Sequence, residues 1–264
     1  MQDLKVSLLQ AELHWESTQA NLSMFEEMIW RIDQPTDVII LPEMFSTGFT
    51  MQPKDLAEPH NFTTFKWMKQ IADQTEALVI GSCVIKEGTA YYNRLYAVKP
   101  GGDHHQYDKK HLFRMAGEDE AYSAGTSRLI FEWKGWKICP MICYDLRFPV
   151  WARNKYDGGS KSTSYDVLIY VANWPVPRIQ AWDTLLKARA IENQSYVLGV
   201  NRVGKDGNGY EFNGHSAVYD FGGKTMAYQE DDINVLQATL NLESKSVFQE
   251  KLPFLKDADA FTIQ

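Results

Sequence analysis

Cys143 stands where an apolar, strand-like run ends, and a cysteine in such a place can act as a nucleophile. The run 138–142 is apolar apart from its proline, and a polar segment begins at Tyr144. A strand-to-helix corner holds its corner side chain in a cleft and points the next backbone N–H groups at whatever it attacks. Helix N-termini also lower the pKa of thiols, which favours a reactive thiolate. Because free cysteine is among the most buried residue types, a structural role for Cys143 is equally open from the corner alone.

A carboxylate and two lysines lie at the ends of other strand-like runs. Glu43 follows Pro42 directly after the β-branched run 37–41, and carboxyl ends of buried strands are where α/β proteins place chemistry. Lys109 and Lys110 lie near a further strand end, and side-chain alternation sends them to opposite faces, so at most one points inward. Taken singly, Glu43 is also explained as a polar strand end, and either lysine as a solvated side chain.

A thiol hydrolase also needs a base, an oxyanion stabiliser and a proton for the leaving group. Histidine is the usual partner of cysteine. The chain has six: His14, His60, His104, His105, His111 and His215. None of them lies in a setting that marks it out, although His111 comes nearest, so a Cys–His hydrolase stays open. Glu118 is, by itself, an acidic residue in a loop.

Composition narrows the classes of partner. The 264 residues carry a net charge of −7, with 44% hydrophobic and 23% charged residues and no block of lysines or arginines. These values argue against nucleic acid or an anionic membrane surface as the main partner. A small anionic substrate is still allowed, because one well-placed arginine can hold a carboxylate whatever the net charge.

The cysteines and the apolar runs bear on the compartment. The chain has only three cysteines, an odd number, which does not suit a disulfide framework. Its first residues do not show the basic-then-apolar pattern of a secretory signal. No apolar run approaches the ~18 residues of a membrane span. We therefore expect a cytoplasmic protein. Zinc-type spacings of cysteine and histidine, and glycine patterns for phosphate, are absent from the sequence.

The pattern of elements predicts two sheets packed face to face, with helices outside, in one domain spanning residues 1–264. In the middle of the chain, strands follow strands and do not alternate strictly with helices. Strands are expected at 4–13, 37–41, 77–84, 91–99, 103–111, 129–133, 136–143, 167–172, 196–202, 215–219, 226–228 and 234–240. Helices are expected from Ser17 or Thr18 onward and at 63–74, 146–156 and 178–193.

Three segments together resemble the signature motifs of the nitrilase superfamily of carbon–nitrogen hydrolases, in the family's order. They are Leu-Pro-Glu-Met-Phe at 41–45, Tyr-Asp-Lys-Lys-His-Leu-Phe at 107–113 and Met-Ile-Cys-Tyr-Asp-Leu-Arg-Phe-Pro at 141–149. The family's lysine lies two residues before His-Leu-Phe, which selects Lys109. Gly-Glu at 117–118 resembles the family's second-glutamate segment. The resemblance extends through 170–175 and 188–194 and covers nearly the whole chain.

The resemblance implies an α/β fold, a four-layer αββα sandwich of two mixed β-sheets with helices outside, and a Glu–Lys–Cys catalytic set. Glu43 would deprotonate Cys143, and Lys109 would hold the oxyanion together with the backbone N–H of Tyr144. A thioester on Cys143 would then be hydrolysed to a carboxylic acid. Glu118 would position substrate or water, with Glu120 as the alternative. No metal or organic cofactor is expected, because Lys109 supplies the positive charge.

Within the family, Cys-Tyr-Asp-Leu-Arg-Phe-Pro at 143–149 and Asn-Trp-Pro at 173–175 resemble the ω-amidase branch, which cleaves the terminal amide of 2-oxo acid amides such as 2-oxoglutaramate. Arg147 would then hold the substrate's far carboxylate, although a buried structural ion pair is the competing explanation. Trp174 would line the pocket, and Phe49 and Phe113 would wall it.

Other readings within and outside this chemistry stay open. They are an N-carbamoyl amino acid amidohydrolase, a nitrilase in the strict sense and a catalytically silent interaction protein. The last should have a broken catalytic set, whereas here the set is intact. The resemblance also implies a homodimer or larger homo-oligomer, and the C-terminal tail at about 250–264 is apolar enough to pack on a partner subunit.

Overall fold

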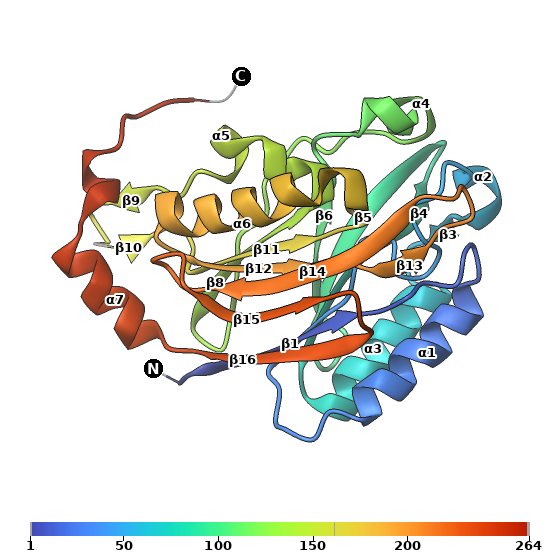
Figure 1. Ribbon diagram of the computed structural model, residues 1–264, viewed down its shortest axis with the longest axis horizontal. Coiled ribbons are helices and arrows are strands. Elements are labelled where there is room, and N and C mark those ends of the chain that lie inside the picture. Colours follow the sequence, from blue (N-terminus) through green and yellow to red (C-terminus); the bar gives the residue numbers. More distant parts are fainter. Residues whose placement is uncertain (1, 161, 263–264) are drawn as a thin grey trace.

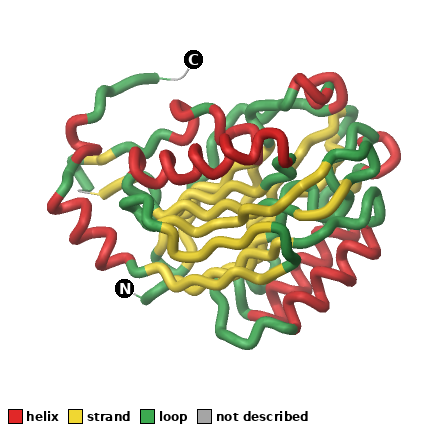
Figure 2. Tube along the Cα trace, in the orientation of Figure 1, coloured by secondary structure: helices red, strands yellow, loops and turns green. Residues whose placement is uncertain are grey.

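The computed structural model describes residues 2–160 and 162–262. In these residues two mixed β-sheets of seven strands each pack face to face, and helices cover their outer faces (Figure 1). Figure 2 shows the strands gathered in the middle of the molecule and the helices at its periphery. The αββα sandwich expected from the sequence is therefore confirmed. No helix in the described residues is long and apolar enough to span a membrane.

The first sheet has the strand order β16-β1-β2-β4-β5-β6, with β3 paired to β4. Its central strands β1, β2 and β4 run parallel, whereas β5, β6 and β16 are antiparallel to their neighbours. The strands are β1 (Leu4–Gln10), β2 (Val38–Ile40), β3 (Glu58–Pro59), β4 (Leu78–Glu87), β5 (Ala90–Val98), β6 (His104–Asp108) and β16 (Asn234–Leu240). Helices α1 (Thr18–Trp30) and α3 (Thr63–Thr75) lie side by side on its outer face, and α2 (Pro53–Leu56) lies near β4.

The second sheet has the order β13-β14-β12-β11-β8-β7, with β15 paired to β14. Its strands are β7 (Phe131–Trp133), β8 (Trp136–Ile142), β11 (Val167–Val171), β12 (Tyr196–Val200), β13 (Val203–Lys205), β14 (Glu211–Tyr219) and β15 (Thr225–Glu230). A separate pair joins β9 (Tyr156–Asp157) to β10 (Ser162–Thr163). Helix α6 (Ile179–Asn193) lies across β12 and β14.

Helix α6 packs closely on its sheet at Gly199 of β12. A Cβ added at Gly199 would lie 2.4 Å from Leu186 and 2.8 Å from Trp182, closer than real Cβ contacts. Both of these α6 side chains are fully buried. We infer that Gly199 sets the distance between helix and sheet.

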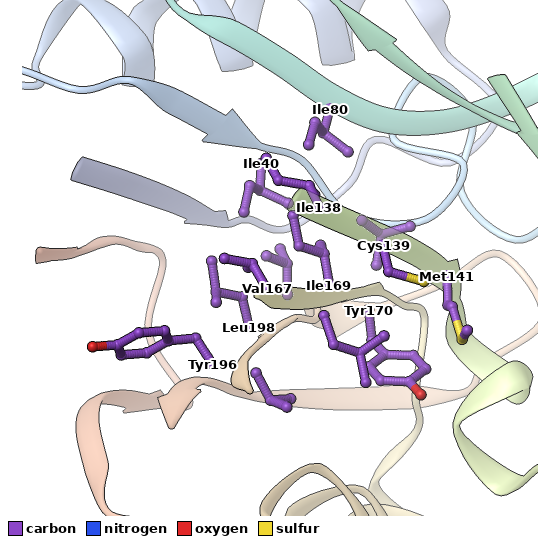
Figure 3. Packing of buried hydrophobic residues seen from close by; sticks show 14 of the residues in the cluster. Ile40, Ile80, Ile138, Cys139, Met141, Val167, Ile169, Tyr170, Tyr196 and Leu198 are labelled. Atoms are coloured by element: carbon purple, nitrogen blue, oxygen red, sulfur yellow. The ribbon is translucent and has the colours of Figure 1, made fainter. Parts of the chain in front are cut away.

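Side-chain alternation in the first sheet fills two cores at once. In β4, Leu78 and Ile80 point into the cluster between the sheets, whereas Val79 points into the cluster beneath α1 and α3. In the inter-sheet cluster, Ile40 and Ile80 face the side chains of Ile138 and other second-sheet residues (Figure 3). Strands buried on both faces explain the nearly continuous apolar runs of the sequence.

The prediction of a helix at 146–156 is wrong. A 3₁₀-helix η2 (Cys143–Arg147) is followed by the single turn α5 (Pro149–Ala152), and β9 begins at Tyr156. Phe148 lies between them with a backbone outside the α region, φ −114° and ψ 85°. The residue before a proline avoids the α region, so Pro149 separates the two helical turns.

The C-terminal part contains a helix that the sequence reasoning did not assign. Helix α7 (Leu242–Lys251) is capped by Asn241, whose side chain accepts a 2.7 Å hydrogen bond from the Ser244 N–H. The 3₁₀-helix η4 (Phe254–Asp257) follows, with Leu255 buried and Phe254 57% exposed. The expected tail at about 250–264 thus packs partly on its own chain, and residues 263 and 264 lie outside the described part.

Candidate active site

The strand-to-helix corner at Cys143 is present, with a 3₁₀ turn in place of an α-helix. Strand β8 ends at Ile142, and Cys143 opens η2 with a φ of 42°, in the left-handed region that residues other than glycine rarely adopt. The carboxylate of Asp145 secures this turn, because it accepts a 3.1 Å hydrogen bond from the Ile142 N–H and a 2.7 Å hydrogen bond from the Tyr107 hydroxyl. Strain of this kind persists only where surrounding contacts over-determine it.

The histidine nearest to this corner serves Asp145 and not the thiol. His111 contacts Asp145 Oδ1 through its backbone N–H at 3.0 Å and through Nδ1 at 2.8 Å, and its ring stacks on Phe148. Among the described residues, no histidine hydrogen-bonds to Cys143. The Cys–His alternative therefore lacks its base.

A buried cluster of two carboxylates and one ammonium lies beside the thiol. Lys109 Nζ is 2.8 Å from Glu43 Oε1 and 2.8 Å from Glu118 Oε2, and all three side chains are at most 1% exposed. Glu43 follows β2, Lys109 follows β6, and Glu118 opens the short helix α4 (Glu118–Ala121). Glu120 is exposed, so the geometry places Glu118 in the cluster.

Asn93 is a member of this cluster that sequence reasoning missed. Its Nδ2 donates to Glu43 Oε1 at 2.9 Å and to Glu118 Oε1 at 3.2 Å, and the residue is fully buried in β5. An asparagine within a strand-like run is unusual, because asparagine is depleted in strands. An asparagine within a predicted strand was therefore the sequence signal that could have pointed to Asn93.

Asn173 is a second missed residue, and it joins Glu43 to Cys143. Its backbone N–H donates to Glu43 Oε2 at 2.9 Å, and its side-chain Nδ2 donates to the backbone carbonyl of Glu43 at 2.6 Å. Its own carbonyl oxygen lies 3.9 Å from Cys143 Sγ. The sequence motif Asn-Trp-Pro after β11 indicated the position but not this role.

The backbone that carries Lys109 is fixed on both sides. Its N–H donates to the Asn93 carbonyl at 3.0 Å, and its carbonyl accepts from the Gly125 N–H at 2.9 Å. A Cβ added at Gly125 would lie 2.1 Å from the carbonyl oxygen of Asp108. Only glycine fits there, which explains the glycine seven residues after Glu118.

The resting protonation states follow from burial and these contacts. Burial opposes the charge on Lys109, but the carboxylates of Glu118 and Glu43 outweigh it and raise the pKa of Lys109. Burial raises the pKa of Glu118, which Lys109 opposes and Glu43 reinforces. Burial and then the charge of Glu43 raise the pKa of the Cys143 thiol well above its usual value, although Lys109 lowers it.

The expectation of a lowered thiol pKa is therefore wrong for the resting protein. Burial and the neighbouring carboxylate of Glu43 raise the pKa of the thiol, and the opposing effect of Lys109 does not offset them. Cys143 therefore rests as a thiol.

Cys143 opens onto a cavity of about 610 Å³, within the size range of small-ligand sites. The cavity brings together the predicted nucleophile, the predicted lysine and every predicted substrate contact. These lining residues are Cys143, Lys109, Tyr144, Arg147, Trp174, Phe49 and Phe113. Glu43 and Glu118 contact Lys109 but do not line the cavity.

The walls of the cavity hold two arginines on aromatic rings. The guanidinium of Arg147 lies 4.9 Å from the centroid of the Trp174 ring. The guanidinium of Arg178, which sequence reasoning did not single out, lies 5.1 Å from the centroid of the Phe113 ring. Within the described part of the chain Arg147 forms no ion pair, so the competing explanation of a structural ion pair finds no partner.

Comparison with known proteins gives the following similarities. The carbon–nitrogen hydrolase family matches residues 5–246. The chain is 45% identical over 264 residues to the omega-amidase YafV of Yersinia enterocolitica, covering 100% of both chains. It is 33% identical over 255 residues to the 2-oxoglutaramate amidase of Bacillus subtilis strain 168, covering 96% of both.

Two solved structures share the fold over nearly the whole chain. XC1258 from Xanthomonas campestris, described as a CN-hydrolase superfamily protein with an arsenic adduct in the active site, is 38% identical with a TM-score of 0.97 and covers 100% of both chains. Nit3 from Saccharomyces cerevisiae, described as a member of branch 10 of the nitrilase superfamily, is 25% identical with a TM-score of 0.83 and covers 96% of this chain and 95% of its own.

Proposed function

The chain belongs to the carbon–nitrogen hydrolase family, and on this premise we propose that it is a thiol-dependent amidase for small carboxylated 2-oxo acid amides. It hydrolyses the terminal amide of a 2-oxoglutaramate-like substrate to the acid and ammonia. The family predicted from the three motifs is confirmed by the match over residues 5–246, and the predicted ω-amidase branch by the relatives of that name.

One observation carries the proposal. A thiol in a strained turn opens onto the same cavity as a buried ammonium that is held between two carboxylates. A structural cysteine needs none of these neighbours. Even a paired buried charge cluster adds little net stability, because desolvation offsets the attraction, so an interaction protein gains nothing from burying these three ionisable groups.

The first half of the reaction forms a thioester. Glu43 takes the proton of Cys143, and the thiolate attacks the amide carbon. The new oxyanion is stabilised by the ammonium of Lys109 and by the backbone N–H of Tyr144; loss of one such donor typically lowers the rate by ~10²–10³. As the C–N bond breaks, Glu43 returns the proton to the departing nitrogen, and ammonia leaves.

The second half hydrolyses the thioester. Glu43 takes a proton from water, the resulting nucleophile attacks the thioester carbon, and Lys109 again holds the oxyanion. The C–S bond breaks, the carboxylic acid is released, and Cys143 recovers its proton. Glu118 positions Lys109 through its two contacts of 2.8 and 3.0 Å, and thereby the oxyanion site.

The substrate's far end lies against Arg147. Its guanidinium is stacked on Trp174 and lacks a protein partner within the described residues, so it is available for a bidentate contact with a carboxylate. Arg147 and Cys143 share η2, which fixes the distance between carboxylate and amide. Phe49, whose ring centroid lies 5.1 Å from Lys109 Nζ, and Phe113 also line the cavity.

A substrate panel tests this function. Ammonia release is measured for 2-oxoglutaramate, a simple neutral amide, an N-carbamoyl amino acid and a nitrile. We expect release chiefly from the oxo acid amide. Activity confined to the carbamoyl compound or the nitrile would keep the catalytic set but contradict the assignment of Arg147, and silence on all four would contradict the function.

We further propose that residues 1–264 form a single domain, acting as a homodimer or larger assembly in the cytoplasm. One buried cluster spans both sheets, which supports the single domain. All three cysteines are free, which suits a reducing compartment. Light scattering of the full chain and of Phe254→Ser tests whether the exposed tail contributes to assembly; a monomeric parent would contradict the proposal.

A further inference from the structure

A second arginine lies in the substrate cavity, and the mechanism above does not use it. Arg178 is the last residue of the 3₁₀-helix η3 (Val176–Arg178) and lines the same cavity as Cys143 and Arg147. We propose that Arg178 binds the 2-oxo oxygen of the substrate and so selects 2-oxo acid amides over amides that lack this oxygen. The assignment rests on the function proposed above.

Arg178 is held in place by the residues that also hold Arg147. The indole N–H of Trp174 donates to the Arg178 carbonyl at 2.8 Å, and the Arg178 N–H donates to the Pro175 carbonyl at 3.0 Å. Trp174 is also the ring on which Arg147 lies. One short segment, 174–178, therefore positions both guanidinium groups.

The other side of Arg178 is fixed to the catalytic cluster. Its guanidinium lies on Phe113, whose ring contacts Tyr144 edge-on at 5.1 Å. The backbone N–H of Phe113 donates to Glu118 Oε2 at 2.6 Å. Arg178 is thus connected through Phe113 to the Glu118–Lys109 pair, and its ordering precedes substrate binding, which lowers the entropy lost on binding.

The cavity's own acids do not neutralise Arg178. Among the described residues its guanidinium forms neither an ion pair nor a hydrogen bond with a protein group. Glu16 accepts a hydrogen bond from the Thr50 hydroxyl at 2.6 Å, and Asp206 accepts from the N–H groups of Asn208 and Tyr210 at 2.9 Å each. An unpaired cation in a concave site points to an anionic or strongly accepting group of the ligand.

The chemistry of a 2-oxo acid calls for two donors. Arg147 is assigned to bind both oxygens of the carboxylate. The N–H groups that make this bidentate contact cannot also bind the adjacent oxo oxygen. Arg178 supplies the second donor. A substrate with an ammonium group at that carbon, such as glutamine, would instead place two positive charges together, so the same residue rejects amino acid amides.

The test compares substrates that differ only at this carbon. Ammonia release is measured for 2-oxoglutaramate, for glutaramate, which keeps the carboxylate and the amide but lacks the oxo oxygen, and for L-glutamine. The variants are Arg178→Met and Arg178→Lys. Arg31→Met is the control, because Arg31 pairs with the exposed Glu27 at 3.5 Å outside the cavity. Thermal unfolding checks that each variant folds.

We expect Arg178→Met to lower kcat/KM for 2-oxoglutaramate by roughly 10- to 100-fold, the loss of one charge-assisted hydrogen bond. For glutaramate the change should stay within about threefold, and Arg178→Lys should keep part of the preference for the oxo acid. The ratio of 2-oxoglutaramate to glutamine activity should fall.

Two other results would overturn the assignment, and they are distinguishable. In the first, the wild type cleaves 2-oxoglutaramate, but Arg178→Met changes kcat/KM for 2-oxoglutaramate and for glutaramate equally or not at all. Arg178 then does not bind the oxo oxygen, while the proposed function stands. If the wild type does not cleave 2-oxoglutaramate, the proposed function fails and the role of Arg178 fails with it.

Discussion

Replacing Glu43 by glutamine should separate thiol reactivity from amide turnover. The carboxylate of Glu43 accepts hydrogen bonds from Lys109, Asn93 and the Asn173 N–H. Glutamine has the same shape and keeps one accepting oxygen, which can serve Lys109 and Asn93, and Lys109 retains Glu118. The Asn173 N–H loses its acceptor, so we expect a stability loss of about 1–3 kcal/mol but a folded protein.

The two reactivities should move in opposite directions. Without its base, amide turnover should fall by ~10²–10⁴. After burial, the charge of Glu43 is the main cause that raises the pKa of the Cys143 thiol, and Lys109 lowers it. Removing this neighbouring negative charge lowers the pKa of the thiol, so the thiolate fraction at neutral pH should rise by ~10-fold or more in Glu43→Gln. Cys143 should therefore be alkylated faster in the inactive variant.

The assay is the rate of carbamidomethylation of Cys143 by iodoacetamide, followed by mass spectrometry from neutral to alkaline pH. In the wild type, labelling should rise steeply with pH, because the thiol with its raised pKa is protonated at neutral pH. The buried Cys83 and Cys139 are internal references, and the exposed Glu120→Gln is the matched control. Unchanged or slower labelling in Glu43→Gln, or wild-type turnover, would refute the reasoning.

Three further variants probe the cluster. Lys109→Met should remove the oxyanion donor, so turnover should fall by at least ~10². It also leaves two buried carboxylates without their cation, so chemical denaturation should show a stability loss of about 3–5 kcal/mol. Undiminished stability would contradict the ion-pair geometry. Asn93→Ala should lower kcat by ~10-fold or more at a stability loss of about 1–3 kcal/mol, whereas an unchanged kcat would make Asn93 merely structural. Gly125→Ala should destabilise by at least about 1–3 kcal/mol and impair turnover by displacing Lys109, and a normal melting temperature would refute the close approach to Asp108.

The candidate catalytic residues were predictable because each lies at, or just after, an element end that the sequence itself marks. Glu43 follows a buried parallel strand, Lys109 follows β6, and Cys143 directly follows β8. The order of the three motifs supplied their grouping, which periodicity alone would not have given. The αββα layers were predictable for a related reason: apolar runs without alternation, as in β2, require burial on both faces.

The supporting residues were not predictable, because their roles depend on contacts between distant segments. Asn93 and Glu43 are 50 positions apart and meet only when β5 lies across β4 from β2. Asn173 reaches Glu43 from the other sheet, across 130 positions. The predicted direction of the Cys143 pKa shift was wrong for the same reason. The strand-to-helix corner could be recognised in the sequence, but the burial of the thiol could not.

The account depends most directly on Cys143 as the nucleophile, and ammonia release by Cys143→Ala measures this. The assay uses 2-oxoglutaramate under conditions in which the wild type is active, with thermal unfolding to show that the variant folds. Since removal of a catalytic nucleophile typically lowers kcat by ~10⁶, the account predicts release indistinguishable from background. Release within about tenfold of the wild type would mean that chemistry proceeds without the thiol, and would contradict the central claim.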